Sequence, residues 1–154
     1  MRTDDRVVPA SALLVGYVTT LVAFVILDAG WLMFFAIDAF KQSVGSILRD
    51  RPDVGAAVAF YCIYAGGLVM LAVRPASMQQ SYRKAVAGGA LVGLPAYATF
   101  DLTNLSVISG WPAMLALADM AWGTAASAVA ALAGYAATSR WSTQSPMHDR
   151  QGAP

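Results

Sequence analysis

The chain has 154 residues, of which 58% are hydrophobic and 12% charged, and its mean hydropathy is +0.57. Soluble domains carry roughly 45–50% apolar and about 25% charged residues, so this composition excludes an ordinary water-soluble domain and indicates an integral membrane protein. Ten Lys and Arg residues against nine acidic ones give a net charge of +1, which excludes the basic surplus of a nucleic-acid-binding protein.

Four segments are apolar and long enough to cross a bilayer, which takes about 20 residues. The predicted spans cover residues 10–37, 54–73, 84–108 and 113–137. The turn Ser109-Gly110-Trp111-Pro112 separates the last two. We therefore expect an all-α fold, an integral membrane four-helix bundle that forms one domain over residues 10–139.

The segments outside the spans are short. Residues 1–9 are predicted to be a cytoplasmic tail, because the apolar stretch that follows is too long for a cleaved signal peptide. Residues 140–154 lack apolar periodicity and are predicted to be a disordered cytoplasmic tail. The first loop carries an apolar stripe, which favours a short interfacial helix over an ordinary linker; it consists of Phe40, Val44, Ile47 and Leu48.

The basic residues predict the orientation in the membrane. Seven of them lie in the N-terminus, the second loop and the C-terminus, against three in the opposite loops. The positive-inside rule then places both termini in the cytoplasm.

Three aspartates lie inside the spans, where a carboxylate costs about 2.5 kcal/mol or more. Asp28 comes late in the first, outward-running helix, Asp101 late in the third, and Asp119 early in the returning fourth. All three are therefore expected at a similar depth in the outer half of the membrane. The side chains predicted to complete a polar, aromatic pocket there are Trp31, Trp122, Tyr61, Tyr64, Tyr97 and Asn104.

The charge balance of this pocket decides its chemistry. The apolar part of the spans holds no Lys, Arg or His, so each carboxyl must be protonated, hydrogen-bonded, exposed to water or bound to a cation. Aromatic rings beside it would suit an organic cation through their π-faces. The alternative is that the aspartates are neutral hydrogen-bonding groups that hold the helices together and have no other role.

Small residues predict close helix packing. They include Gly89 and Gly93 on the third span, a row on the fourth, and the pair Gly66 and Gly67 on the second. The row on the fourth span is Gly123, Ser127, Ala130 and Gly134. Such faces would also serve a homodimer. Pro95 is expected to kink the third span, and Trp111 to lie in an interfacial belt.

Four stretches of the chain resemble a family of small predicted bacterial membrane proteins, the domain of unknown function 2177. They are Leu27-Asp28-Ala29-Gly30-Trp31-Leu32, residues 60–68, residues 96–104 with Asp101-Leu102-Thr103-Asn104, and Asp119-Met120-Ala121-Trp122-Gly123-Thr124. The resemblance implies a four-span protein of the bacterial inner membrane. It implies no reaction, substrate or cofactor.

The leading hypothesis is a membrane protein that binds or transports a cationic solute or protons through the outward-facing aspartate and aromatic pocket. One alternative is a membrane-embedded enzyme that acts on lipid-like substrates. The other is a non-catalytic accessory subunit of a larger membrane complex. One cysteine, Cys62, and one histidine, His148, exclude a zinc-type site within one chain, and no metal or cofactor is predicted. The expected partners are the lipid bilayer, a second copy or a larger complex, and a cation or proton, but no nucleic acid.

Overall fold

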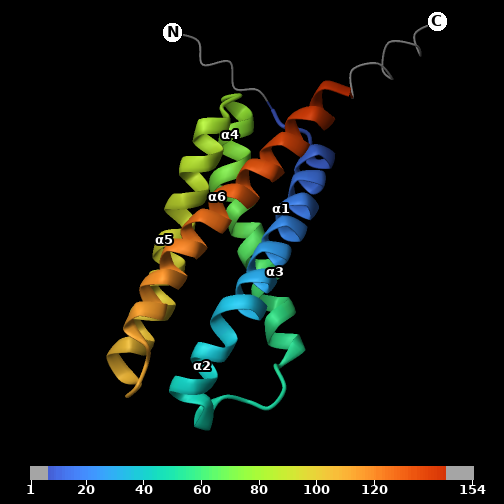
Figure 1. Ribbon diagram of the computed structural model, residues 1–154. Helices are drawn as coiled ribbons and strands as arrows, with labels where there is room; N and C mark the ends of the chain where they lie inside the picture. Colours follow the sequence, from blue (N-terminus) through green and yellow to red (C-terminus); the bar gives the residue numbers. More distant parts are fainter. Residues whose placement is uncertain (1–6, 145–154) are drawn as a thin grey trace, which may run out of the picture.

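The computed structural model describes residues 7–144 and contains helices and turns but no strand in that range. Four segments are long and apolar enough to cross a membrane: Ala10–Ile47, Val54–Met78, Tyr82–Val107 and Ala113–Thr143. They run alternately up and down in one bundle (Figure 1). The predicted all-α architecture with four spans is confirmed.

The two ends of the bundle differ in what they carry (Figure 1). The start of α1 (Ala10–Trp31), the turn that follows α4 (Arg74–Met78) and the end of α6 (Ala113–Gln144) lie together, and we call this the α4 end. The opposite end carries α2 (Ile37–Val44) and the turn between α5 (Tyr82–Val107) and α6, and we call it the α2 end.

The helix in the first loop is a continuation of the first span. A π-helical turn, Leu32–Ala36, joins α1 directly to α2, and a 3-10 turn, Gly45–Ile47, ends it. The first helical segment therefore continues to Ile47, past residue 37 where the sequence predicted the span to end. Val44 is buried, whereas Ile47 is 61% exposed, so only part of the predicted apolar stripe packs against the protein.

The second span is also built from joined pieces, α3 (Val54–Leu68), a π-helical turn η3 (Val69–Val73) and α4. Asp53 caps its first turn by accepting a hydrogen bond from the Ala56 backbone N–H at 3.1 Å. At the other end of the chain, α6 remains helical through Gln144, so the prediction of disorder is wrong for residues 140–144. The predictions for residues 1–6 and 145–154 lie outside the described residues.

The helix α6 packs against α5 along one side and against α1 along the other. Between α5 and α6 the contacts depend on glycine. A Cβ atom at Gly89 would lie 2.5 Å from the Ser127 carbonyl oxygen, and one at Gly93 would lie 2.7 Å from that of Gly123. The predicted small-residue faces on these two spans are confirmed, and they are used within the chain, where they cannot serve a second copy.

The contact between α1 and α6 also depends on glycine. Gly16 lies against Thr138, and Gly134 lies against Thr20. By contrast, no atom lies within 4 Å of a Cβ placed at Gly67, and Gly66 only touches the edge of Tyr17. The prediction that the glycine pair on the second span packs closely is therefore wrong.

The contacts of the second span change along its length. Its η3 and α4 parts pack against α5, whereas α3 barely touches α5. Gly88 of α5 lies close to Ala72 of η3, which fixes the two spans together at the α4 end. Toward the α2 end they diverge, and the space between them is where the candidate site lies.

Candidate functional site

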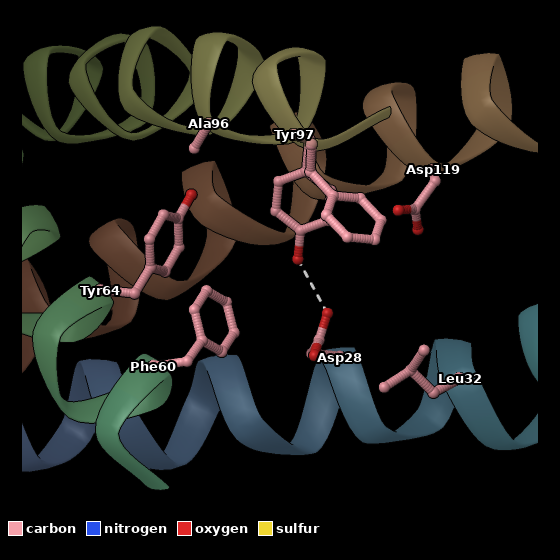
Figure 2. Close-up of a pocket in the computed structure, with 8 residues that line it drawn as sticks. Asp28, Leu32, Phe60, Tyr64, Ala96, Tyr97 and Asp119 are labelled. Atoms are coloured by element: carbon pink, nitrogen blue, oxygen red, sulfur yellow. Dashed lines mark hydrogen bonds between the residues drawn. The ribbon is translucent and has the colours of Figure 1, made fainter. Parts of the chain in front are cut away.

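A cavity of about 290 Å³ lies among the four spans in the half of the bundle nearer the α2 end. Every span contributes to its wall, and Figure 2 shows their side chains converging on it. The lining residues are Asp28, Leu32, Phe60, Tyr64, Ala96, Tyr97, Phe100 and Asp119. Two acidic groups thus lie in a wall that is otherwise aromatic and aliphatic.

Asp28 is held by two tyrosines from two other spans. The Tyr61 hydroxyl of α3 donates to Asp28 Oδ2 at 2.7 Å, and the Tyr97 hydroxyl of α5 donates to Oδ1 at 2.8 Å, the bond drawn in Figure 2. Each carboxylate oxygen therefore has one hydroxyl partner. A tyrosine hydroxyl both donates and accepts, so the same contacts suit the charged and the protonated carboxyl.

Asp119 is held by a tryptophan from the first span. The Trp31 indole N–H donates to Asp119 Oδ1, and the Trp31 ring stacks on Trp122 with centroids 5.3 Å apart and an interplanar angle of 13°. Each tryptophan comes three residues after an aspartate of its own helix, so spacing alone would pair Trp31 with Asp28 and Trp122 with Asp119. The structure instead joins α1 to α6 through them, since Trp31 reaches the acid of the neighbouring helix.

Asp101 lies behind the cavity and does not line it. Its side chain is fully buried, and neither carboxylate oxygen has a hydrogen-bond partner among the described residues. Asp119 and Trp111 are polar neighbours of Asp101. Asp101 comes six residues before the end of α5 and Asp119 six residues after the start of α6, which places both about 9 Å below the turn between them. Asp101 and Asp119 therefore lie at a similar height in the bundle.

Trp111, in the turn between α5 and α6, packs against two other aromatic rings. Its ring centroid is 5.0 Å from that of Phe40 in α2 and 5.7 Å from that of Phe100, and its indole nitrogen is buried. It therefore joins α2 to the α5–α6 turn and covers the α2 end of the site.

The three acids have no basic partner in the described part of the chain. Within residues 7–144 the single salt bridge joins Arg49 to Asp53 at 3.4 Å, on the exposed first loop. In the same range, no three His, Cys, Asp or Glu side chains converge closely enough to hold a metal ion. The negative charge of Asp28 and Asp119 must therefore be balanced by hydrogen bonds, by protons or by a ligand.

Of the three remaining predicted site residues, one lines the cavity and two do not. Tyr64 lines the cavity and shares a hydrogen bond of 2.7 Å with the Ser127 hydroxyl. Asn104 is outside the lining, and its backbone carbonyl accepts a hydrogen bond from the Ile108 N–H at the end of α5. Trp122 supports Trp31 from behind.

Sequence reasoning missed four lining residues, Leu32, Phe60, Ala96 and Phe100. The signal for two of them is helical spacing. Phe60 comes four residues before Tyr64, and Phe100 three residues after Tyr97, so each shares a helix face with a tyrosine already selected.

A comparison with protein-family models places this site in a family. The model described as predicted membrane protein (DUF2177) matches residues 13–136. The chain belongs to this family. The matched region contains the whole lining of the cavity and all three intramembrane aspartates. No curated protein and no solved structure matches the chain significantly. The family description gives a membrane location and no activity.

Proposed function

We propose that this protein is a multi-pass protein of the bacterial inner membrane that binds a cationic solute in its aspartate and aromatic cavity, in exchange for protons. One observation carries the proposal. Asp28 and Asp119 line an aromatic cavity inside a membrane-spanning bundle, and no basic side chain of the described residues pairs with either. A carboxylate in such a place needs a positive counterpart, and a proton or a bound cation supplies one.

The aromatic lining favours an organic cation over a hydrated metal ion. Rings of Phe60, Tyr64, Tyr97 and Phe100 surround the space next to the acids. The π-face of an aromatic ring attracts an ammonium group, and the attraction reaches about 2 kcal/mol when both are out of water. Tyr61 and Tyr97 would hold Asp28 in either protonation state as cation and proton exchange.

Asp101 would add a third carboxyl group to Asp28 and Asp119, on the side of the site away from the ligand. It adjoins Asp119 and has no hydrogen-bond donor of its own among the described residues. A proton released from the cavity would thus have a second carboxyl to occupy. Movement of the solute across the membrane, as distinct from binding, would need conformational change and at least a homodimer of so small a bundle.

The cavity would open toward the outside of the cell. At the α4 end lie Arg74, Arg83, Lys84 and Arg140, whereas the segment after α2 and α2 itself carry Lys41, Arg49 and Arg51. This distribution favours a cytoplasmic α4 end and therefore cytoplasmic termini.

The test is proton release from the purified protein on addition of a cation. Unbuffered protein in neutral detergent is titrated with tetramethylammonium or dodecyltrimethylammonium chloride while the pH is recorded at a series of starting values. We expect at least one cation to release protons, and Asp28→Asn and Asp119→Asn each to reduce the release. Asp38→Asn makes the same chemical change on an exposed residue of α2 and serves as the matched control. Identical traces for the parent chain, D28N and D119N would refute the proposal.

A further inference from the structure

The mouth of the cavity lies on the side of the bundle, between α3 and α5. Phe60 of α3 is 45% exposed and Phe100 of α5 is 53% exposed, although both line the cavity. Ala96, the third lining residue on this side, is exposed as well. All three belong to membrane-spanning segments, so the medium that they face is the acyl-chain region of the bilayer.

Packed aromatic rings lie between the cavity and the α2 end. Phe40 of α2 packs on Trp111, and Trp111 packs on Phe100 at the edge of the cavity. Asp101, below these rings, is completely buried. A ligand that arrives from water along the bundle axis would have to displace them, whereas the mouth between α3 and α5 is already open.

The size of the cavity limits what can enter. A volume of about 290 Å³ is at the small end of ligand pockets, which range over about 300–1,000 Å³, so it accommodates a small head group and a few carbon atoms. A longer apolar chain on the same molecule would have to leave through the mouth. There it would lie between α3 and α5 in contact with lipid.

We infer that the ligand is an amphiphilic cation, a long-chain amine or quaternary ammonium compound, whose head occupies the cavity beside Asp28 and Asp119 while its tail remains in the bilayer. The inference rests on the proposed function and adds to it the class of ligand and the route of entry. Such a molecule reaches the site by lateral diffusion in the membrane. Its tail keeps it concentrated at the depth of the mouth. Its positive head supplies the charge that would pair with the carboxylates of Asp28 and Asp119.

The experiment measures the binding of a homologous series to the full-length protein in lipid nanodiscs. The probes are radiolabelled tetramethyl-, butyltrimethyl-, octyltrimethyl- and dodecyltrimethylammonium, and discs with the Asp28→Asn/Asp119→Asn double variant give the binding to lipid alone. We expect the apparent affinity, referred to the aqueous concentration, to rise about fourfold for each added methylene, the ratio for transferring a CH₂ group out of water. A small soluble ammonium ion should then bind far more weakly than the long-chain members.

Two tryptophan variants test the route. Ala96→Trp places a large ring in the mouth without touching the packed core, and Leu91→Trp makes a comparable change on the lipid-facing side of α5, where Leu91 is 73% exposed. We expect A96W to weaken dodecyltrimethylammonium binding at least about tenfold and L91W to leave it unchanged. Far-ultraviolet circular dichroism and elution volume check that both variants remain folded.

The outcomes separate the two proposals. Acid-dependent binding that strengthens with chain length and is lost in A96W supports lateral entry. Equal affinity for tetramethylammonium and dodecyltrimethylammonium, with no effect of A96W, overturns the amphiphilic ligand but leaves cation binding intact. If no member of the series shows binding that depends on Asp28 and Asp119, cation binding itself fails, and this inference fails with it.

Discussion

Substitution of Gly89 by alanine tests the packing that holds the site together. A methyl group there would lie 2.5 Å from the Ser127 carbonyl oxygen, 2.8 Å from the Ala128 Cα and 2.8 Å from the Ala131 Cβ. Ordinary contacts are about 3.3–3.6 Å for carbon to oxygen and about 3.5–4.0 Å for carbon to carbon. Two of the three atoms are backbone atoms that cannot rotate away, so α5 and α6 must move apart by somewhat less than about 1 Å.

The structure gives an expected size for this effect. Overpacking of a tight interface costs typically about 1–3 kcal/mol, and backbone contacts place Gly89→Ala in the upper half of that range. Alanine also gains about 0.5–1 kcal/mol over glycine in a helix, which would hide part of the cost. Gly67→Ala makes the same gain in helix propensity without overpacking, because Gly67 is helical and no atom lies within 4 Å of its added Cβ. The gain therefore cancels when the two variants are compared. We therefore expect G89A to be about 2–3 kcal/mol less stable than G67A.

The free energy of unfolding is measured in mixed micelles by raising the fraction of dodecyl sulfate and following helix content by circular dichroism. Both variants need reversible unfolding with equal slopes for the comparison to hold. If G89A unfolds at the same dodecyl sulfate fraction as G67A, α5 and α6 do not approach as closely as described. The geometry of the cavity that these two helices help to line would then be in error.

Three further predictions address the site itself. In a double-mutant cycle of Tyr97→Phe and Asp28→Leu, which removes the acceptor, we expect a coupling of about 0.6–1.7 kcal/mol in the free energy of unfolding, the range for hydrogen bonds inside membranes, and a coupling near zero would remove the Tyr97–Asp28 contact. Trp31→Phe loses the indole donor to Asp119 and should destabilise the fold by about 1–3 kcal/mol because a buried carboxylate oxygen loses its partner; unchanged unfolding would contradict that bond. For topology, a cysteine replacing Lys41 in a C62S background should react with an impermeant maleimide in intact cells, and one replacing Gln79 only after permeabilisation; the reverse pattern would invert the orientation.

The membrane character of the chain could be predicted from sequence because it depends on local properties. A bilayer core of fixed thickness requires about 20 apolar residues for each helix, and that requirement is visible in the order of residues alone. The three aspartates stood out for the same reason, since charge is costly wherever the chain enters the bilayer. The glycine faces on α5 and α6 followed from residue size and helical spacing.

Other features depended on how the helices are rotated about their axes, which the sequence does not state. Asp101 and Asp119 share a depth, yet only Asp119 lines the cavity, and on α5 it is Tyr97, one turn before Asp101, that reaches Asp28. Hydropathy likewise separated α2 from the first span, whereas a π-helical turn joins them. The glycine pair on the second span has the composition of a packing face but meets no partner.

The sequence by itself determined the number of spans and the presence of three acids without intramembrane basic partners, because each follows from the free energy of placing one residue in lipid or in water. Only the tertiary structure decided which of these acids reach the cavity, that Trp31 serves the acid of another helix, and that the cavity opens sideways between α3 and α5. These depend on close contacts between helices, where small residues set the distance and rotation of each pair, and such contacts join positions far apart in the chain.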